Sequence, residues 1–246
     1  MVGMTGHDTN VANVPKSFEE YTKTYETPRF TDWLRKRAEP EWTNATTHRF
    51  TSDLGTGDLD DDVFQRYLVQ DYAFVETLVG VFGHAIGDAP TMESKSRLVD
   101  FLGVLTADEN DYFERSFEAL AVPQTEYIDS DLAPTTRAFE DLLKRAANEG
   151  GYVETLAVLV PAEWVYLEWA THVEDDSPAR FYLEEWIDLH TNEEFRAFIA
   201  WLRDELDREG KDVSLRRQRR IERLFRRTVS LEIVFFEMAY SLPNDE

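Results

Sequence analysis

Apolar side chains recur three and four positions apart along most of the chain, a spacing that gathers them on one face of an α-helix. Alternation of apolar and polar residues, which would predict β-strands, nowhere extends beyond a few positions. Helices are predicted from about residue 27 and over 63–87, 91–120, 135–150, 152–173, 177–190, 191–210 and 213–240, with loops at 53–62 and 122–134. The pattern therefore predicts an all-α fold, a single-domain bundle of about eight helices.

Turn and capping residues support these boundaries. Pro28 suits the first turn of a helix that starts near residue 27. Thr191 and Glu194 form a T-x-x-E capping box at the start of 191–210. Because residues 1–26 are polar and irregular, we predict a flexible N-terminal tail over 1–26 and one helical domain over 27–246.

Length and charge narrow the class of protein. The chain has 246 residues, 42% of them hydrophobic, which is enough to bury a sizeable core. Its formal net charge is −23, and its 26 basic residues are twenty arginines and six lysines. Surplus acid with scarce lysine favours a halophilic protein over an ordinary acidic one. The same charge repels nucleic acid and anionic membranes.

Several kinds of site are excluded or disfavoured by residue type. Without cysteine there is no disulfide, thiolate zinc site or thiol nucleophile. The five histidines form no H-x-x-x-H or E-x-x-H pair, so no metal or cofactor is predicted. No apolar run of about 18 residues predicts a membrane span, and the N-terminus has no signal-peptide core. We therefore predict a cytoplasmic protein.

One segment is strongly basic: residues 215–227 read LRRQRRIERLFRR. Such a run can bind nucleic acid, or it can be one face of a helix that pairs with acidic residues. In a chain of net charge −23, pairing within the chain or between subunits is favoured over DNA binding.

Acids set among apolar residues are the candidate chemistry. Asp71 shares a helix face with Tyr67 and Phe74, and Glu232 lies in the apolar run of the last helix. Residues 160–170, VPAEWVYLEWA, carry two tryptophans and a tyrosine beside two glutamates. An acid on an apolar face is costly to bury unless it is paired, so each could instead face solvent or an arginine. Two such acids on different helices, together with the aromatic stretch, favour a site.

Four ordered motifs resemble those of the TenA family (thiaminase II), in the TenA/THI-4/PqqC group of haem-oxygenase-like proteins. They are HRFTSDLGTGDLDDDVFQRYLVQDYAF (48–74), LVPAEWVYLEWA (159–170), FYLEEWIDLHTNEEF (181–195) and LEIVFFEMAY (231–240). The resemblance covers most of the chain, from about Phe30 to Tyr240.

The resemblance implies a haem-oxygenase-like bundle with a central pocket, in homotetramers or dimers. It also implies hydrolysis of aminopyrimidine products of thiamin breakdown, which releases ammonia and returns hydroxymethylpyrimidine to thiamin salvage. By the family's motifs, Asp71 would hydrogen-bond the ring nitrogen and amino group of the pyrimidine. Glu232 would be the acid/base carboxyl, and Tyr166 would line the pocket.

The departures from the family pattern concern its polar groups. The nucleophilic cysteine of the family falls at Ala162, and family tyrosines fall at Phe74, Phe139 and His190. Phenylalanine keeps the stacking surface without the hydroxyl, whereas histidine keeps a polar tip. The chain is closer to the branch without cysteine, in which carboxylates do the chemistry. Glu163 is a candidate substitute for the thiol, although it lies about 100° round the helix from Ala162.

The predicted function is thus an enzyme: a hydrolase of amino- or formylamino-methylpyrimidine in thiamin salvage, acting through carboxylates. The alternatives are a non-catalytic pyrimidine-binding protein with the same pocket, or a regulatory protein. The expected partners are a small aminopyrimidine and further copies of the chain, with no nucleic acid and no membrane. Trp164 and Trp169 are expected to pack in the core rather than contact a ligand.

Overall fold

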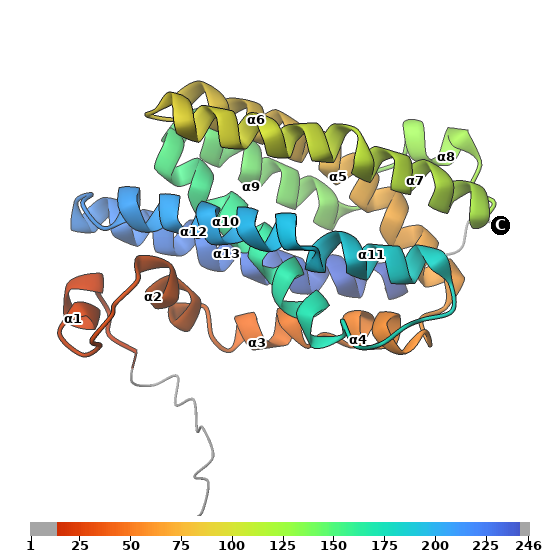
Figure 1. Ribbon diagram of the computed structural model, residues 1–246, viewed down its shortest axis with the longest axis horizontal. Helices are drawn as coiled ribbons and strands as arrows, with labels where there is room; N and C mark the ends of the chain where they lie inside the picture. The colour runs from red at the N-terminus through yellow and green to blue at the C-terminus, as the bar shows by residue number, and fades with distance from the viewer. Residues whose placement is uncertain (1–13, 242–246) are drawn as a thin grey trace, which may run out of the picture.

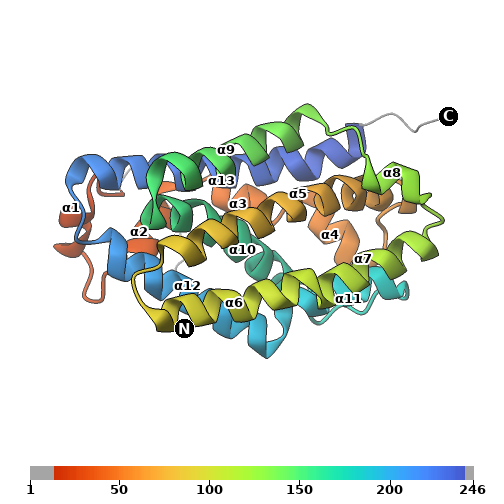
Figure 2. The same cartoon turned by 90° about the horizontal axis from the view of Figure 1, so that it is seen from above.

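The apolar faces predicted from the sequence pack against one another in a computed structural model that describes residues 14–241 (Figures 1 and 2). Every regular element in this range is a helix, which confirms the predicted all-α class. The helices are α1 (Phe18–Thr22), α2 (Phe30–Arg37), α3 (Glu41–Thr46), α4 (Arg49–Thr56), α5 (Asp61–Asp88), α6 (Met92–Thr106), α7 (Asp108–Ala119), α8 (Gln124–Ile128), α9 (Pro134–Gly150), α10 (Tyr152–His172), α11 (Phe181–Thr191), α12 (Glu193–Gly210) and α13 (Leu215–Ser241).

Helix α10 forms the centre of the molecule. It packs against α13, α12, α9, α11 and α5, and it runs through the middle of the bundle in both views (Figures 1 and 2). All its residues from Tyr152 to Val165 are buried. A helix that is apolar on every side must be enclosed on every side, so the surrounding helices are arranged around this one. None of the helices within residues 14–241 is long and apolar enough to cross a membrane.

The structure contains more helices than the eight predicted. Two predicted helical segments are interrupted, namely the one that starts near residue 27 and the one over 91–120. Two predicted loops contain helical turns, and α1 lies in the predicted tail. The segment 91–120 breaks at Ala107, whose backbone angles are φ −117° and ψ −72°. The loop at 53–62 begins inside α4, which ends at Gly57 with φ 75°, a left-handed conformation that glycine adopts without strain. The loop at 122–134 contains α8.

The predicted capping box is wrong. Thr191 is the last residue of α11, and its hydroxyl donates to the carbonyl of Ile187 at 2.9 Å. The N-cap of α12 is Asn192, whose side-chain oxygen accepts from the Phe195 amide at 2.8 Å. The boundary between the two helices was predicted, but the N-cap of the second helix lies at Asn192, one residue later than the predicted Thr191.

The N-terminal segment differs from the predicted tail where it is described. Residues 1–13 lie outside the described residues, but α1 follows, and its Phe18 and Tyr21 are buried. The Phe18 ring meets Phe30 edge-on with centroids 5.1 Å apart. The segment is too short and too polar to show a helical period, and its two aromatic side chains anchor it against α2.

Part of the basic segment pairs within the chain. The guanidinium of Arg217 donates to both carboxylate oxygens of Glu154, at 2.9 and 2.6 Å. Glu222, an acid inside the same segment, accepts from Arg37 at 2.8 Å. Both contacts tie α13 to neighbouring helices.

Replacing the α12 cap tests its position. We expect Asn192→Ala to lower the free energy of unfolding by about 1 kcal/mol, because the amide of Phe195 loses its acceptor. Thr191→Ala should cost less, since that hydroxyl only adds a bond to a carbonyl already within α11. Denaturant titration of both variants measures the difference. A larger loss in Thr191→Ala would restore the capping box.

Candidate active site

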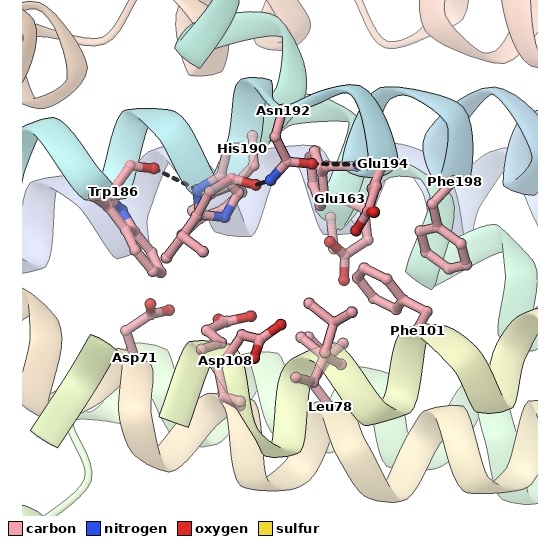
Figure 3. Close-up of a pocket in the computed structure, with 18 of the residues that line it drawn as sticks. Asp71, Leu78, Phe101, Asp108, Glu163, Trp186, His190, Asn192, Glu194 and Phe198 are labelled. Carbon is pink, nitrogen blue, oxygen red and sulfur yellow. Dashed lines mark hydrogen bonds between the residues drawn. The ribbon is translucent and has the colours of Figure 1, made fainter. Parts of the chain in front are cut away.

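A cavity of about 490 Å³ lies between two layers of helices, one formed by α5, α6 and α7 and the other by α10, α11, α12 and α13. Figure 3 shows side chains of both layers directed into this space, among them Asp71 from below and Glu163 from above. The exposed Arg97, Asp108 and Glu194 also line it, so the cavity reaches solvent beside them. A volume of this size suits a small-molecule ligand.

The walls are largely aromatic and aliphatic. Phe101 of α6 and Phe198 of α12 stack face to face with centroids 3.7 Å apart and an interplanar angle of 9°. Phe74, Leu78 and Trp186 also belong to the apolar lining, and Figure 3 shows Leu78 and Trp186. Flat apolar walls favour a flat, partly apolar ligand such as a heteroaromatic ring.

Three carboxyl side chains from three helices lie in this apolar space. Asp71 of α5 is 3% exposed, Glu163 of α10 is 6% exposed and Glu232 of α13 is 1% exposed. Burial raises the pKa of Asp71 to about 7, an effect that hydrogen bonding with Tyr67 opposes in part. Burial, and then the charge of Asp71, raises the pKa of Glu163 to about 8 and that of Glu232 well above its usual range.

Their lack of cation partners distinguishes these acids from the other buried acids. Glu140, Glu154, Glu205 and Glu222 are also buried, and each forms an ion pair with lysine or arginine at 2.5–2.8 Å. Within residues 14–241, the three cavity acids have no such pair. Glu163 Oε1 and Glu232 Oε1 have no hydrogen-bond partner in that range either. Among the described residues, the buried acids outside the cavity are thus each paired with a cation, and the three inside it are not.

A fourth acid, Glu109, was missed in the sequence. It lies in the first turn of α7 and lines the cavity, and its pKa is raised well above its usual range by burial and then by the charges of Glu163 and Asp71. A signal was present, because Glu109 stands four residues after Leu105 and four before Phe113, both buried. It interrupts an apolar face in the same way as Asp71.

His190 contributes a hydrogen-bond acceptor. Its Nδ1 lies 2.7 Å from the carbonyl oxygen of Trp186. Since a carbonyl only accepts, Nδ1 carries the hydrogen and Nε2 is left with a lone pair. Burial lowers the pKa of His190 to about 4, which keeps the ring neutral above that pH.

Most of the predicted site residues meet in this one cavity. Those that line it are Asp71, Phe74, Ala162, Tyr166, His190 and Glu232. Phe139 is not among the lining residues. Its ring lies behind Phe74, with centroids 4.6 Å apart, so the structure places it in support of the wall rather than on it.

Two neighbouring residues of α10, Ala162 and Glu163, both face the cavity. Glu163 lines the cavity together with Ala162 although the two lie about 100° apart on the helix. The cavity wraps round a wide arc of α10, which is buried on every side. Trp164 and Trp169 are buried in the core and outside the lining, as expected.

The part of the chain that the structure describes holds no group of three or more His, Asp or Glu side chains placed to bind a metal ion. The acids therefore surround a space rather than converge on a point.

Comparison with known proteins finds relatives over most of the chain. The model of the TENA/THI-4/PQQC family matches residues 35–242. An aminopyrimidine aminohydrolase from Halalkalibacterium halodurans is 27% identical over 213 residues, which cover 85% of this chain and 94% of that protein. The aminopyrimidine aminohydrolase of Bacillus subtilis is 21% identical over 212 residues, covering 86% of this chain and 90% of that protein.

Solved structures share the fold. A structure described as a TenA family transcription regulator from Silicibacter has a TM-score of 0.80 and 23% identity, and covers 87% of this chain and 97% of its own. A TenA homologue from P. horikoshii has a TM-score of 0.78 and 23% identity, and covers 86% of this chain and 98% of its own. The arrangement of helices around the cavity is therefore one that experimental structures contain.

The raised pKa values predict how stability varies with pH. The folded chain holds protons on Asp71 and Glu163 that the unfolded chain releases near pH 4, so stability falls as pH rises through the folded pKa values of about 7 and 8. His190 acts in the opposite sense between about pH 4 and 6.5, so the test begins above pH 6.5.

As the pH rises from 6.5 to 8, the free energy of unfolding should fall in both chains. We expect the fall to be about 1–2 kcal/mol smaller in Glu163→Gln than in the unsubstituted chain. Denaturant titration at fixed salt across this range measures it. Equal slopes for the two chains would mean that Glu163 is ionised in the folded state throughout.

Proposed function

The chain belongs to the TENA/THI-4/PQQC family, and on this basis we propose that it hydrolyses aminopyrimidines by means of buried carboxyls. The proposed substrate is a thiamin-breakdown product, amino- or formylamino-methylpyrimidine, and the product is the hydroxymethylpyrimidine used in thiamin salvage. The name of the relatives at 21–27% identity, aminopyrimidine aminohydrolase, supports this substrate class.

One observation carries the proposal: Asp71, Glu163 and Glu232 are the buried acids without a cation partner within the described chain, and all three line one cavity. Keeping such groups buried costs free energy, and the cost is explained if a ligand rich in hydrogen-bond donors completes the site. An aminopyrimidine presents donors on its ring amino group and its aminomethyl group.

The ring is held by shape and by Asp71. Its flat faces fit the apolar lining from Phe74 and Trp186, and Asp71 hydrogen-bonds the ring nitrogen and its amino substituent. With a pKa of about 7, Asp71 can donate to the ring nitrogen when protonated and accept from the amino group. This arrangement fixes the methylene carbon relative to the remaining acids.

Because Ala162 supplies no thiol nucleophile, water is the nucleophile in the proposed reaction, and a base has to take a proton from it. An aliphatic amine is protonated at neutral pH, with a pKa near that of lysine, about 10.4. A bound ammonium therefore lowers the pKa of nearby Glu232 and ionises it. Glu232 takes a proton from water as the water oxygen bonds to the methylene carbon. The bond from that carbon to nitrogen breaks, and ammonia leaves.

Ala162 supports a second candidate, a pyrimidine-binding protein without turnover. A methyl group at this position cannot form the covalent adduct that the family's thiol forms, while the cavity keeps its shape. Such a protein binds aminopyrimidine and releases no ammonia, so the two candidates differ in a single measurement.

That measurement, in molar salt, is release of ammonia from aminomethylpyrimidine, and release of formate together with ammonia from formylaminomethylpyrimidine. We expect turnover by the unsubstituted chain and a loss of roughly 10²–10⁴-fold in kcat for Glu232→Gln, the usual contribution of an acid/base group. Glu237→Gln is the matched control, because Glu237 lies on the same helix with its side chain 53% exposed.

Full activity in Glu232→Gln would remove its assigned role. If neither substrate is turned over while aminopyrimidine still raises the melting temperature, the binding-protein candidate replaces the enzyme.

We further propose a cytoplasmic homo-oligomer, a tetramer or a dimer, adapted to high salt and without nucleic-acid contacts. The charge of −23 with only six lysines supports salt adaptation and opposes DNA binding. Light scattering in molar salt should give a mass that is a multiple of the 28.6 kDa chain. Thermal unfolding should show a lower melting temperature in dilute buffer, where the acidic side chains repel one another. A monomer of equal stability in both conditions would contradict this proposal.

A further inference from the structure

Two acids of the cavity have no part in the reaction as proposed. Asp71 holds the ring and Glu232 activates water, which leaves Glu109 on α7 and Glu163 on α10, both among the lining residues. They come from opposite layers of the cavity, and Figure 3 shows Glu163 directed toward the layer that carries α7. Their charges act on one another, since Glu163 is among the groups that raise the pKa of Glu109.

The protein supplies these two acids with no counter-charge in the described chain. Arg97 is the cationic side chain of the lining, and it is exposed on α6. His190 is neutral, and its inward nitrogen is an acceptor. Elsewhere in the molecule a buried glutamate such as Glu154 receives an arginine at 2.6 Å.

Glu163 also points to a ligand by itself. It is 6% exposed, it lines the cavity, and its Oε1 is buried with no hydrogen-bond partner within residues 14–241. An acceptor in this state favours a donor brought by a ligand, because a buried polar atom without a hydrogen-bond partner destabilises the fold. A cationic donor gains more than a neutral one, since charge-assisted hydrogen bonds are about twice as strong.

We propose that Glu109 and Glu163 form a subsite for a primary ammonium group, and that this pair selects the charged aminomethyl ligand over neutral ligands with the same ring. The inference rests on the proposed function for the identity of the ring. The two carboxylates hold the nitrogen from opposite walls, and Glu232 is left free to act on water. A neutral hydroxymethyl or formylamino group leaves the pair without its counter-charge.

The subsite is consistent with product release. When the bond between carbon and nitrogen breaks, the charge leaves the ligand and the hydroxymethyl product loses its attraction to Glu109 and Glu163. Charge therefore distinguishes substrate from product at a point where their shapes are nearly the same.

Binding measurements test the subsite apart from catalysis. In a Glu232→Gln background, which prevents turnover under the proposed function, titration calorimetry gives the affinity for aminomethylpyrimidine and for hydroxymethylpyrimidine. We expect Glu109→Gln and Glu163→Gln each to weaken aminomethylpyrimidine binding by roughly 10- to 100-fold, the value of a hydrogen bond to a charged group. Binding of the neutral hydroxymethylpyrimidine should change by less than about threefold, since a satisfied neutral contact is worth less.

Glu118→Gln is the matched control for charge. Glu118 lies on the same helix as Glu109, is exposed and does not line the cavity, and its replacement removes the same formal charge. It should leave both affinities within about threefold, because exposed charges are screened.

Three results would overturn the subsite: no loss of aminomethylpyrimidine affinity in Glu109→Gln and Glu163→Gln, an equal loss for both ligands, or no binding of the amine by the background chain. Absence of ammonia release by the unsubstituted chain is a separate failure. It would contradict the proposed reaction, and the calorimetry alone would then decide whether the cavity prefers an ammonium group.

Discussion

The burial of carboxyls without counter-ions is the constraint on which this structure depends. Asp71, Glu163 and Glu232 are each less than a tenth exposed, and no cation within the described chain pairs with them. Their protonated forms are the cheapest to bury, which is why burial is the main cause of every raised pKa in the cavity. Such a site can persist only if the packing of the surrounding helices stabilises the fold by more than the burial of these carboxyls destabilises it.

That free energy comes from the apolar helices around the site. Helix α10 is buried on every side over Tyr152–Val165, and stacked rings such as Phe101 on Phe198 brace the two layers. Arginines are used outside the cavity, where Arg217 and Arg208 neutralise Glu154 and Glu205. The distribution of cations, more than that of acids, marks which buried carboxyls are available to a ligand.

The sequence predicted the fold class from the three-and-four spacing of apolar side chains, whereas most of the predicted cavity residues came from the resemblance to the family's motifs. Asp71 and Glu232 stood out as acids on apolar faces, and they do lie in the cavity. Glu109 has the same signature and was missed, because it stands beside Asp108 and Asp111 in a stretch with the composition of a solvated first turn of a helix.

Other differences depend on contacts that spacing cannot show. Phe139 was predicted to line the cavity, but it is not among the lining residues, and its ring packs against Phe74 with centroids 4.6 Å apart. The choice of Asn192 over Thr191 as the α12 cap depends on which side chain reaches the Phe195 amide, and asparagine is the more favoured of the two residue types at this position. The course of residues 14–26 is set by aromatic contacts with α2 that leave no period in so short a segment.

The acids beside Ala162 also bear on what evolution could restore at that position. A thiol there would be almost fully enclosed, since Ala162 is 4% exposed, and it would adjoin Glu163 in a cavity shared with Asp71 and Glu232. Burial raises a thiol pKa, and any negative charge on Glu163 would raise it further. A cysteine at position 162 would therefore be less reactive with Glu163 beside it than without it, so the residue at position 163 governs how well a thiol could act in this cavity.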